Sequence, residues 1–147
     1  GYDIFNGDAD GICALHQLRL NKPSNRTLIT GVKRDIKLLD KVKFKKDDLI
    51  SVFDISIDSN QEALKKGLER GAYFEWFDHH SSETVPNHPN LQCYLTSETG
   101  VCSSLMVDKF LNGRFRSWAL VACYGDNFTA KAVILGTEMG LSKKQLE

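Results

Sequence analysis

The sequence lacks the features that mark secreted and membrane proteins. It holds only four cysteines, none of them in a CxxC pair, and each lies among apolar or small residues as a buried free thiol does. No apolar run approaches the roughly 20 residues that span a bilayer, and no signal-peptide pattern precedes the first strand-like segment. We therefore expect a reduced, cytoplasmic protein with no disulfide framework and no membrane partner.

An excess of charge of either sign is also missing. Lys plus Arg and Asp plus Glu each number 19, so the formal net charge is zero, and any anion binding must be local. Lys33, Arg34 and the basic stretch 41–46, which acidic residues interrupt, are expected to form a solvated face. The 147 residues suit one domain. Residues 141–147 begin a helix that stops almost at once, so we expect more chain in the intact protein.

Strand-like and helix-like segments alternate along the chain. The β-favouring segments are 2–5, 27–30, 49–53, 72–77 and 91–95, and the helix-favouring segments are 12–20, 60–70, 100–111, 118–124 and 130–135. Such alternation is typical of a parallel sheet covered by helices. The sequence predicts an α/β fold with an open, mainly parallel five-stranded sheet and helices on both faces, a Rossmann-like domain.

Acidic side chains follow several of the predicted strands. Asp8 and Asp10 lie in the turn after the first strand, Asp54 follows the third and Asp78 follows the fourth. The carboxyl ends of parallel strands share one edge, where open sheets bind ligands, and neighbouring strands lie about 4.8 Å apart. Clustered carboxylates repel one another unless a cation compensates. The sequence therefore predicts a site for hard divalent metal ions at this edge.

Two histidines and a further acid extend this set. His79 and His80 follow Asp78 directly, and Asp126 stands after Gly125 near the end of a predicted helix. Adjacent side chains of an extended chain point to opposite sides, so we expect one imidazole to bind metal and the other to face a substrate. Oxygen and imidazole ligands together favour metal-assisted phosphoryl chemistry.

Each motif has a plainer interpretation when it is taken alone. An Asp-x-Asp-Gly sequence after a strand is most often a turn whose Asp accepts backbone hydrogen bonds, and Asp54 alone is most simply a cap at a strand end. The stretch from Asn6 also imitates a calcium-binding loop, which would make the protein a structural calcium module. Gln17, however, stands where such a loop requires a bidentate Glu.

Taken together, the motifs resemble those of the DHH phosphoesterase superfamily, in particular the RecJ-like DHH subfamily 1. Asn6-Gly7-Asp8-Ala9-Asp10-Gly11 is similar to the first motif, Asp54 to the second, Asp78-His79-His80 to the third and Gly125-Asp126 to the fourth, in the expected order. Residues 99–104 are similar to the helix start that follows the third motif. The superfamily includes RecJ-type exonucleases, oligoribonucleases with nucleotide phosphatase activity, cyclic-dinucleotide phosphodiesterases and family II inorganic pyrophosphatases. The resemblance covers nearly the whole chain.

The resemblance implies a phosphoesterase in which two Mn²⁺ ions activate a water, with Mg²⁺ or Co²⁺ as substitutes. Asp54 would bridge the ions. Asp8 would bind one ion, and Asp10, His79 and Asp126 would bind the other. The implied substrate is a phosphodiester or phosphomonoester of a nucleotide or short oligonucleotide.

The resemblance also assigns the residues beside the metal ligands. His80 would contact the scissile phosphate and Asp78 would orient the histidines, which makes His80, Asp54 and Asp78 the expected catalytic set. In this family a second domain, usually C-terminal, supplies much of the substrate grip. We therefore expect residues 1–147 to be the DHH catalytic domain of a longer protein.

Two positions depart from the family's pattern. Ile4 stands where many members have a histidine ligand of the first metal, and Asn6 stands where RecJ-like members often have Asp. Asn6 offers only a neutral amide oxygen as a weak metal or substrate contact, so we expect the first metal to bind more weakly than the second. The alternative is a catalytically inactive DHH module that binds nucleic acid, nucleotide or a protein partner, because some family members kept the fold and lost catalysis.

Overall fold

Five strands form one open sheet, and every neighbouring pair in it is parallel. The structure is a computed structural model that describes all residues from 1 to 147. The strands are β1 (Tyr2–Asn6), β2 (Thr27–Gly31), β3 (Leu49–Phe53), β4 (Tyr73–Asp78) and β5 (Leu91–Leu95), in the order β2-β1-β3-β4-β5. The α/β prediction is confirmed, and each predicted strand agrees with the observed one to within one residue at each end.

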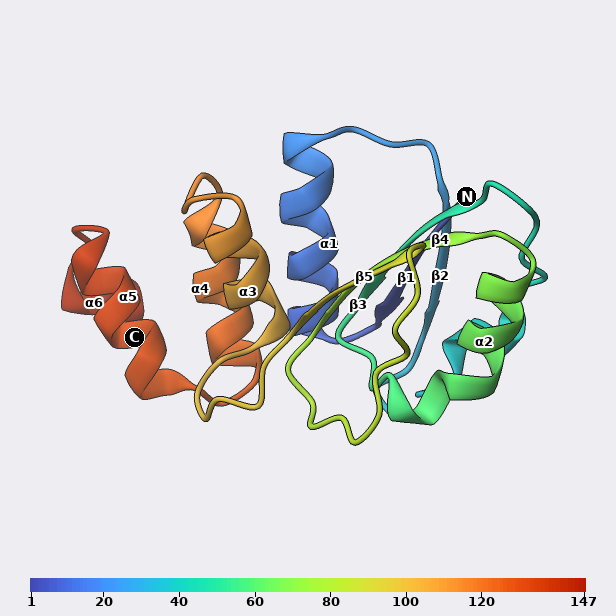
Figure 1. Ribbon diagram of the computed structural model, residues 1–147. Coiled ribbons are helices and arrows are strands. Elements are labelled where there is room, and N and C mark those ends of the chain that lie inside the picture. The colour runs from blue at the N-terminus through green and yellow to red at the C-terminus, as the bar shows by residue number, and fades with distance from the viewer.

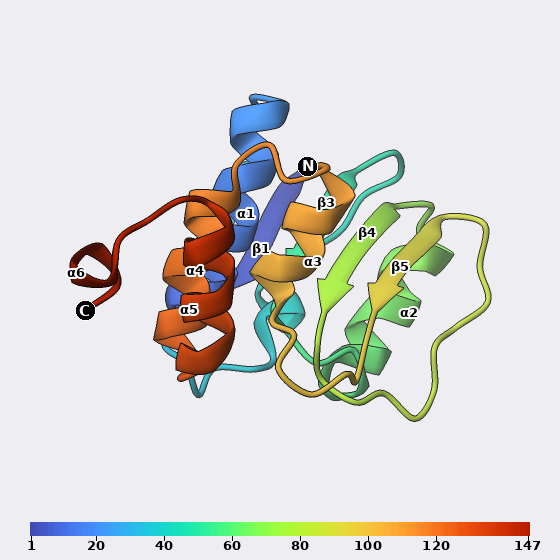
Figure 2. The same ribbon diagram turned by 90° about the vertical axis from the view of Figure 1, so that its left-hand side faces the viewer.

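Helices cover both faces of the sheet (Figure 1). They are α1 (Ala9–Asn21), α2 (Gln61–Glu69), α3 (Ser103–Phe110), α4 (Arg116–Gly125), α5 (Thr129–Glu138) and α6 (Lys143–Leu146), with 3₁₀ turns η1 (Leu38–Lys41) and η2 (Asp58–Asn60). Helices α1, α3 and α4 pack together on one face, and α2 lies on the other with η1 and η2. Helices α5 and α6 lie beyond α4, on the side away from the sheet (Figure 1), and α5 lies in front of α4 when the molecule is viewed from that side (Figure 2).

Side chains of the central strands alternate between the two faces, as the two-residue period of a strand requires. The cluster on the α2 face includes Ile4 of β1, Val52 of β3 and Trp76 of β4. The residues that follow them, Phe5, Phe53 and Phe77, belong to a separate cluster on the α1 and α3 face. Both faces are therefore buried, which explains the nearly continuous apolar character of these strands.

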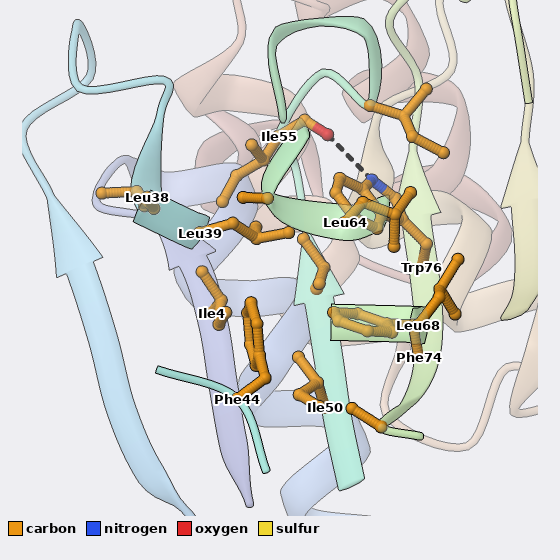
Figure 3. Close-up of a cluster of buried hydrophobic side chains, with 14 residues drawn as sticks. Ile4, Leu38, Leu39, Phe44, Ile50, Ile55, Leu64, Leu68, Phe74 and Trp76 are labelled. Carbon is orange, nitrogen blue, oxygen red and sulfur yellow. Dashed lines mark hydrogen bonds between the residues drawn. The ribbon is translucent and has the colours of Figure 1, made fainter. Parts of the chain in front are cut away.

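The larger cluster holds 14 buried residues beneath α2 (Figure 3). Trp76 is fully buried, and its indole Nε1 donates a hydrogen bond to the carbonyl oxygen of Ile55 at 2.9 Å. Phe44 also belongs to this cluster and packs edge-on against Phe74, with ring centroids 5.2 Å apart. The prediction of a solvated face for residues 41–46 is therefore wrong at Phe44, although the four lysines of that stretch are exposed.

A buried asparagine connects two loops at the carboxyl edge of the sheet by hydrogen bonds. The side chain of Asn60 donates to the carbonyl oxygens of Ile36 and Ser56, and its Oδ1 accepts from the amide of Leu39. The loop after β2 is thereby tied to the loop after β3. No helix in the structure combines the length and the apolar character needed to cross a membrane.

Candidate metal centre

The strand order places a topological switch point between β1 and β3. The chain leaves β1 for α1 on one face and leaves β3 for α2 on the opposite face, so the two connections diverge at the carboxyl edge of the sheet. Open α/β sheets bind ligands in the crevice at such a point. A cleft of about 430 Å³ opens here and is lined mainly by polar residues, among them Asn6, Asp8, Asp54, His79, His80 and Asp126.

Asp10 lies beneath the cleft, in the first turn of α1, and is fully buried. Its two carboxylate oxygens accept hydrogen bonds from the backbone amides of Ser103, at 2.8 Å, and Ser104, at 2.7 Å. These amides open helix α3, whose N-terminus favours a negative charge. Burial, and secondarily the charge of Asp54, nevertheless raises the pKa of Asp10 to about 6. A cation beside Asp10, in addition to the two amides, would stabilise the ionised carboxylate.

Asp54 follows β3 in a left-handed backbone conformation, with φ at 57°. Its Oδ1 accepts a hydrogen bond from the hydroxyl of Ser103 at 3.2 Å, so the carboxylate lies on the α3 side of the sheet. Phe53 packs on that same side, which regular strand alternation would forbid for the next residue. The left-handed turn thus brings Asp54 to Asp10. Such a conformation is strained by about 1–3 kcal/mol in most residues and occurs preferentially at functional sites.

His79 lies beside three carboxylates, each of which comes from a different segment of the chain. Its Nε2 lies 3.2 Å from Asp54 Oδ1 and 3.8 Å from both Asp10 Oδ2 and Asp126 Oδ2. The hydrogen bond to Asp54, together with the surrounding negative charge, raises the pKa of His79 to about 9. The protonated form of His79 is therefore favoured and offsets part of the negative charge of the three carboxylates.

His80 lies at the edge of the same cluster and is about half exposed. Its Nδ1 donates to Asp78 Oδ1 at 2.6 Å, and this hydrogen bond raises the pKa of His80. The rings of His79 and His80 have centroids only 4.6 Å apart. The prediction that the two imidazoles point to opposite sides is therefore wrong, because β4 ends at Asp78 and the histidines lie beyond the extended strand.

The two carboxylate oxygens of Asp8 have different partners. It is the N-cap of α1, and its Oδ1 accepts from the amides of Asp10, at 3.1 Å, and Gly11, at 3.2 Å. Its Oδ2 lies 3.0 Å from the ammonium of Lys33, which is also 3.7 Å from Asp126 Oδ1. Burial alone would raise the pKa of Asp8, but Lys33 and the Gly11 amide outweigh it and lower the pKa.

Close packing at two glycines brings these segments together. A Cβ atom at Gly7 would overlap the carbonyl oxygen of Gly31, which keeps the turn after β1 against the end of β2. A Cβ atom at Gly125 would overlap the side chain of Ala9 at the start of α1. The first contact places Lys33 beside Asp8, and the second places Asp126, the residue after α4, at the same cleft.

The residues present fit a divalent metal ion. The ligand atoms of Asp10, His79 and Asp126 lie within 4.8 Å of one another, and those of Asp54, His79 and His80 form a second such group. Asn6 Oδ1, at the cleft, and Asp78 Oδ2, behind His80, are buried without a hydrogen-bond partner. Unpartnered buried oxygens beside carboxylates and an imidazole are the donor set that a manganese-like ion uses.

The structure distributes the expected site residues unevenly. Asp10, Asp54, His79 and Asp126 converge, and His80 borders them, whereas Asp8 belongs to neither group of candidate ligands. The calcium-loop interpretation has no structural basis: the loop follows a strand, and the buried Gln17 lies in α1, where its Nε2 donates to Ser104 O. Two contributors were not expected. They are Lys33, which follows the end of β2 by two residues, and the opening amides of α3.

Comparison of the chain with protein-family models and with curated proteins finds no match. The resemblance to the DHH superfamily therefore depends on the motifs themselves, on their order and on their convergence at one cleft.

Proposed function

We propose that this chain is the catalytic domain of a metal-dependent phosphoesterase of the DHH superfamily, which hydrolyses a phosphodiester or phosphomonoester of a nucleotide or short oligonucleotide. One observation carries the proposal. Four residues from four separate segments, Asp10, Asp54, His79 and Asp126, bring their ligand atoms together beside a polar cleft at the switch point of the sheet. The four motifs occur in the order that the superfamily requires.

These four residues would hold the metal, and Mn²⁺ fits a site of carboxylates with a single imidazole better than Ca²⁺ does, with Mg²⁺ or Co²⁺ as substitutes. A bound ion would lower the pKa of a coordinated water and offset charge on the phosphate oxygens. Asp10 is fixed by the α3 amides and Asp54 by Ser103, so both carboxylates are oriented before any ion binds.

His80 supplies the contact with the phosphate. Its Nδ1 is engaged by Asp78, and the resulting rise in pKa favours the protonated ring, whose Nε2–H is free to donate to a phosphate oxygen. His80 lines the cleft, as a residue that meets the substrate must. Ile36, Ile55 and Phe128 form the apolar part of the same lining. Ile55 is buried, so Ile36 and Phe128 provide the surface for a nucleoside base.

A second candidate is a DHH module that binds a nucleotide, nucleic acid or protein partner without hydrolysis. The ion pair between Lys33 and Asp8 favours it, because a protein cation stands beside an expected metal ligand. We place either activity in the cytoplasm, since all four cysteines are free.

Hydrolysis assays with Mn²⁺ separate the two. We expect release of nitrophenol from bis(p-nitrophenyl) phosphate or of mononucleotides from short oligonucleotides, and loss of both activities with EDTA and in Asp54→Asn. Asp47→Asn is the matched control, because Asp47 is exposed, has a similar φ of 63° and precedes β3 at the opposite edge of the sheet. Binding of a nucleotide without any turnover, at enzyme in excess of substrate, would instead support the non-hydrolytic module.

A further inference from the structure

One lysine enters the acidic centre from the loop after β2. Lys33 Nζ lies 3.0 Å from Asp8 Oδ2 and 3.7 Å from Asp126 Oδ1, and no other lysine or arginine pairs with a carboxylate of the centre. The close contact of Gly7 with Gly31 holds the end of β2 against the turn that carries Asp8. The backbone that leads to Lys33 is therefore held beside Asp8, although the lysine side chain itself is largely exposed.

The side of the centre that Lys33 occupies is poor in metal ligands. Asp8 Oδ1 is already engaged by two amides of α1, which leaves Oδ2 as its one free oxygen. Asn6 adds only a neutral amide, and Ile4 is fully buried in the apolar cluster under α2, so β1 contributes no imidazole. His79, in contrast, lies with Asp10, Asp54 and Asp126.

We infer that Lys33 is a built-in cation of the centre: its ammonium takes the position between Asp8 and Asp126 that a second ion would occupy, so that the protein binds one divalent ion where the resemblance implies two. This inference rests on the proposed function. A small divalent cation such as Mg²⁺ binds carboxylate oxygens at about 2.1 Å, so an ion at that position would have to approach Asp8 Oδ2 to about this distance. The ammonium already contacts that oxygen, and two cations sharing it would repel each other.

The tether of the lysine favours it over a free ion. A group tethered to the same chain has an effective concentration in the millimolar range. A free metal ion would have to displace this ammonium, and few ligands on this side of the centre are present to bind the ion. An ammonium has three N–H donors. Asp8 Oδ2, at 3.0 Å, is within reach of one of them, whereas Asp126 Oδ1, at 3.7 Å, is an ion-pair partner only. The side chain of Lys33 lines the cleft, so the remaining donors are available to an oxygen of the substrate.

The test is to count bound Mn²⁺ by calorimetric titration and to record its electron paramagnetic resonance spectrum. We expect one ion with an isolated six-line signal in the wild type and in Lys33→Arg, which retains the charge. Lys33→Gln should bind two ions and show the exchange-coupled spectrum of a bridged pair. Arg34→Gln is the control for loss of a neighbouring positive charge, because Arg34 is exposed and makes no ion pair, and it should bind one ion.

Two ions in the wild type would overturn the inference while leaving the proposed function intact, and so would a single ion in Lys33→Gln. Absence of bound Mn²⁺ from the wild type and from every variant would overturn the proposed metal centre itself. Lys33 is exposed, so its replacement leaves the core unchanged. Lys33→Met, measured beside Lys33→Gln, ensures that the count does not depend on one replacement.

Discussion

Replacing Asp54 by asparagine should remove most of the stability that Mn²⁺ confers on the protein. The substitution keeps the side-chain volume, and asparagine tolerates the positive φ of 57° at this position. The metal-free fold is therefore retained. What is lost is the carboxylate charge beside His79, the residue that both groups of candidate ligands share.

The size of the effect follows from mass action. With free Mn²⁺ at a hundredfold excess over its Kd, binding to the native state alone stabilises by about 2.7 kcal/mol. Each kcal/mol raises the Tm of a chain of this length by about 2–4 °C, so the wild type should gain roughly 5–11 °C. A hundredfold weaker Kd in Asp54→Asn leaves about 0.4 kcal/mol at the same Mn²⁺ concentration, or a gain of about 1–2 °C.

The measurement is thermal unfolding of EDTA-stripped protein with and without added Mn²⁺. Asp47→Asn again serves as the control, because it places the same substitution in the same backbone conformation at an exposed position, and it should keep the full gain. If the wild-type Tm does not respond to Mn²⁺, or if Asp54→Asn keeps the wild-type gain, the reasoning that places the ion at Asp54 is refuted.

Three further outcomes can be checked on the same protein. His79→Ala should weaken Mn²⁺ binding in calorimetry, whereas His80→Ala should leave the metal bound and lower turnover by about 10²-fold or more, as expected for a lost donor to the transition state; equal metal loss in both would contradict this division. Asp3→Asn removes the charge of a buried carboxylate that accepts hydrogen bonds from two arginines. The free energy of unfolding in urea should therefore fall by about 1–3 kcal/mol, with no change in Mn²⁺ affinity. Gly125→Ala forces a methyl group against Ala9, so stability should fall by about 1–3 kcal/mol and Mn²⁺ should bind more weakly; a variant unchanged in both respects would show that this contact does not position the site.

The centre of the sheet could be predicted because β1, β3 and β4 are buried on both faces and are therefore nearly continuous apolar runs. Leu49–Phe53 agrees with the predicted strand at both ends, since turns and charged residues flank it. The 3₁₀ turn at Leu38–Lys41 and the burial of Phe44 were not foreseen. Phe44 has one periodic apolar neighbour, Val42, which also packs against the cluster, and an alternation of two apolar residues among lysines is too short to indicate which side of the chain is buried.

The site could be predicted in part because the carboxyl ends of parallel strands lie at one edge of the sheet. This follows from the fold class alone and requires no knowledge of side-chain contacts. The support of Asp10 by the amides of Ser103 and Ser104 could not be inferred in the same way, because 93 and 94 residues separate the partners. The division of the Asp8 carboxylate between an N-cap and Lys33 depends on side-chain geometry. Lys33 follows its strand end as Asp54 does, and applying the same argument to basic residues would have indicated it.

The carboxylates around the candidate ion differ in how firmly they are held, and this has a mechanical consequence. Both oxygens of Asp10 are fixed by backbone amides, and Asp54 is held through Ser103 and through its own amide, which donates to Phe77 O. The side chain of Asp126 accepts no hydrogen bond and has only two ion-pair partners, Lys33 at 3.7 Å and His79 at 3.8 Å. Asp10 and Asp54 are thus held rigidly, whereas Asp126 can move. An ion of larger radius would be accommodated by displacement of Asp126, without movement of the sheet or of α3.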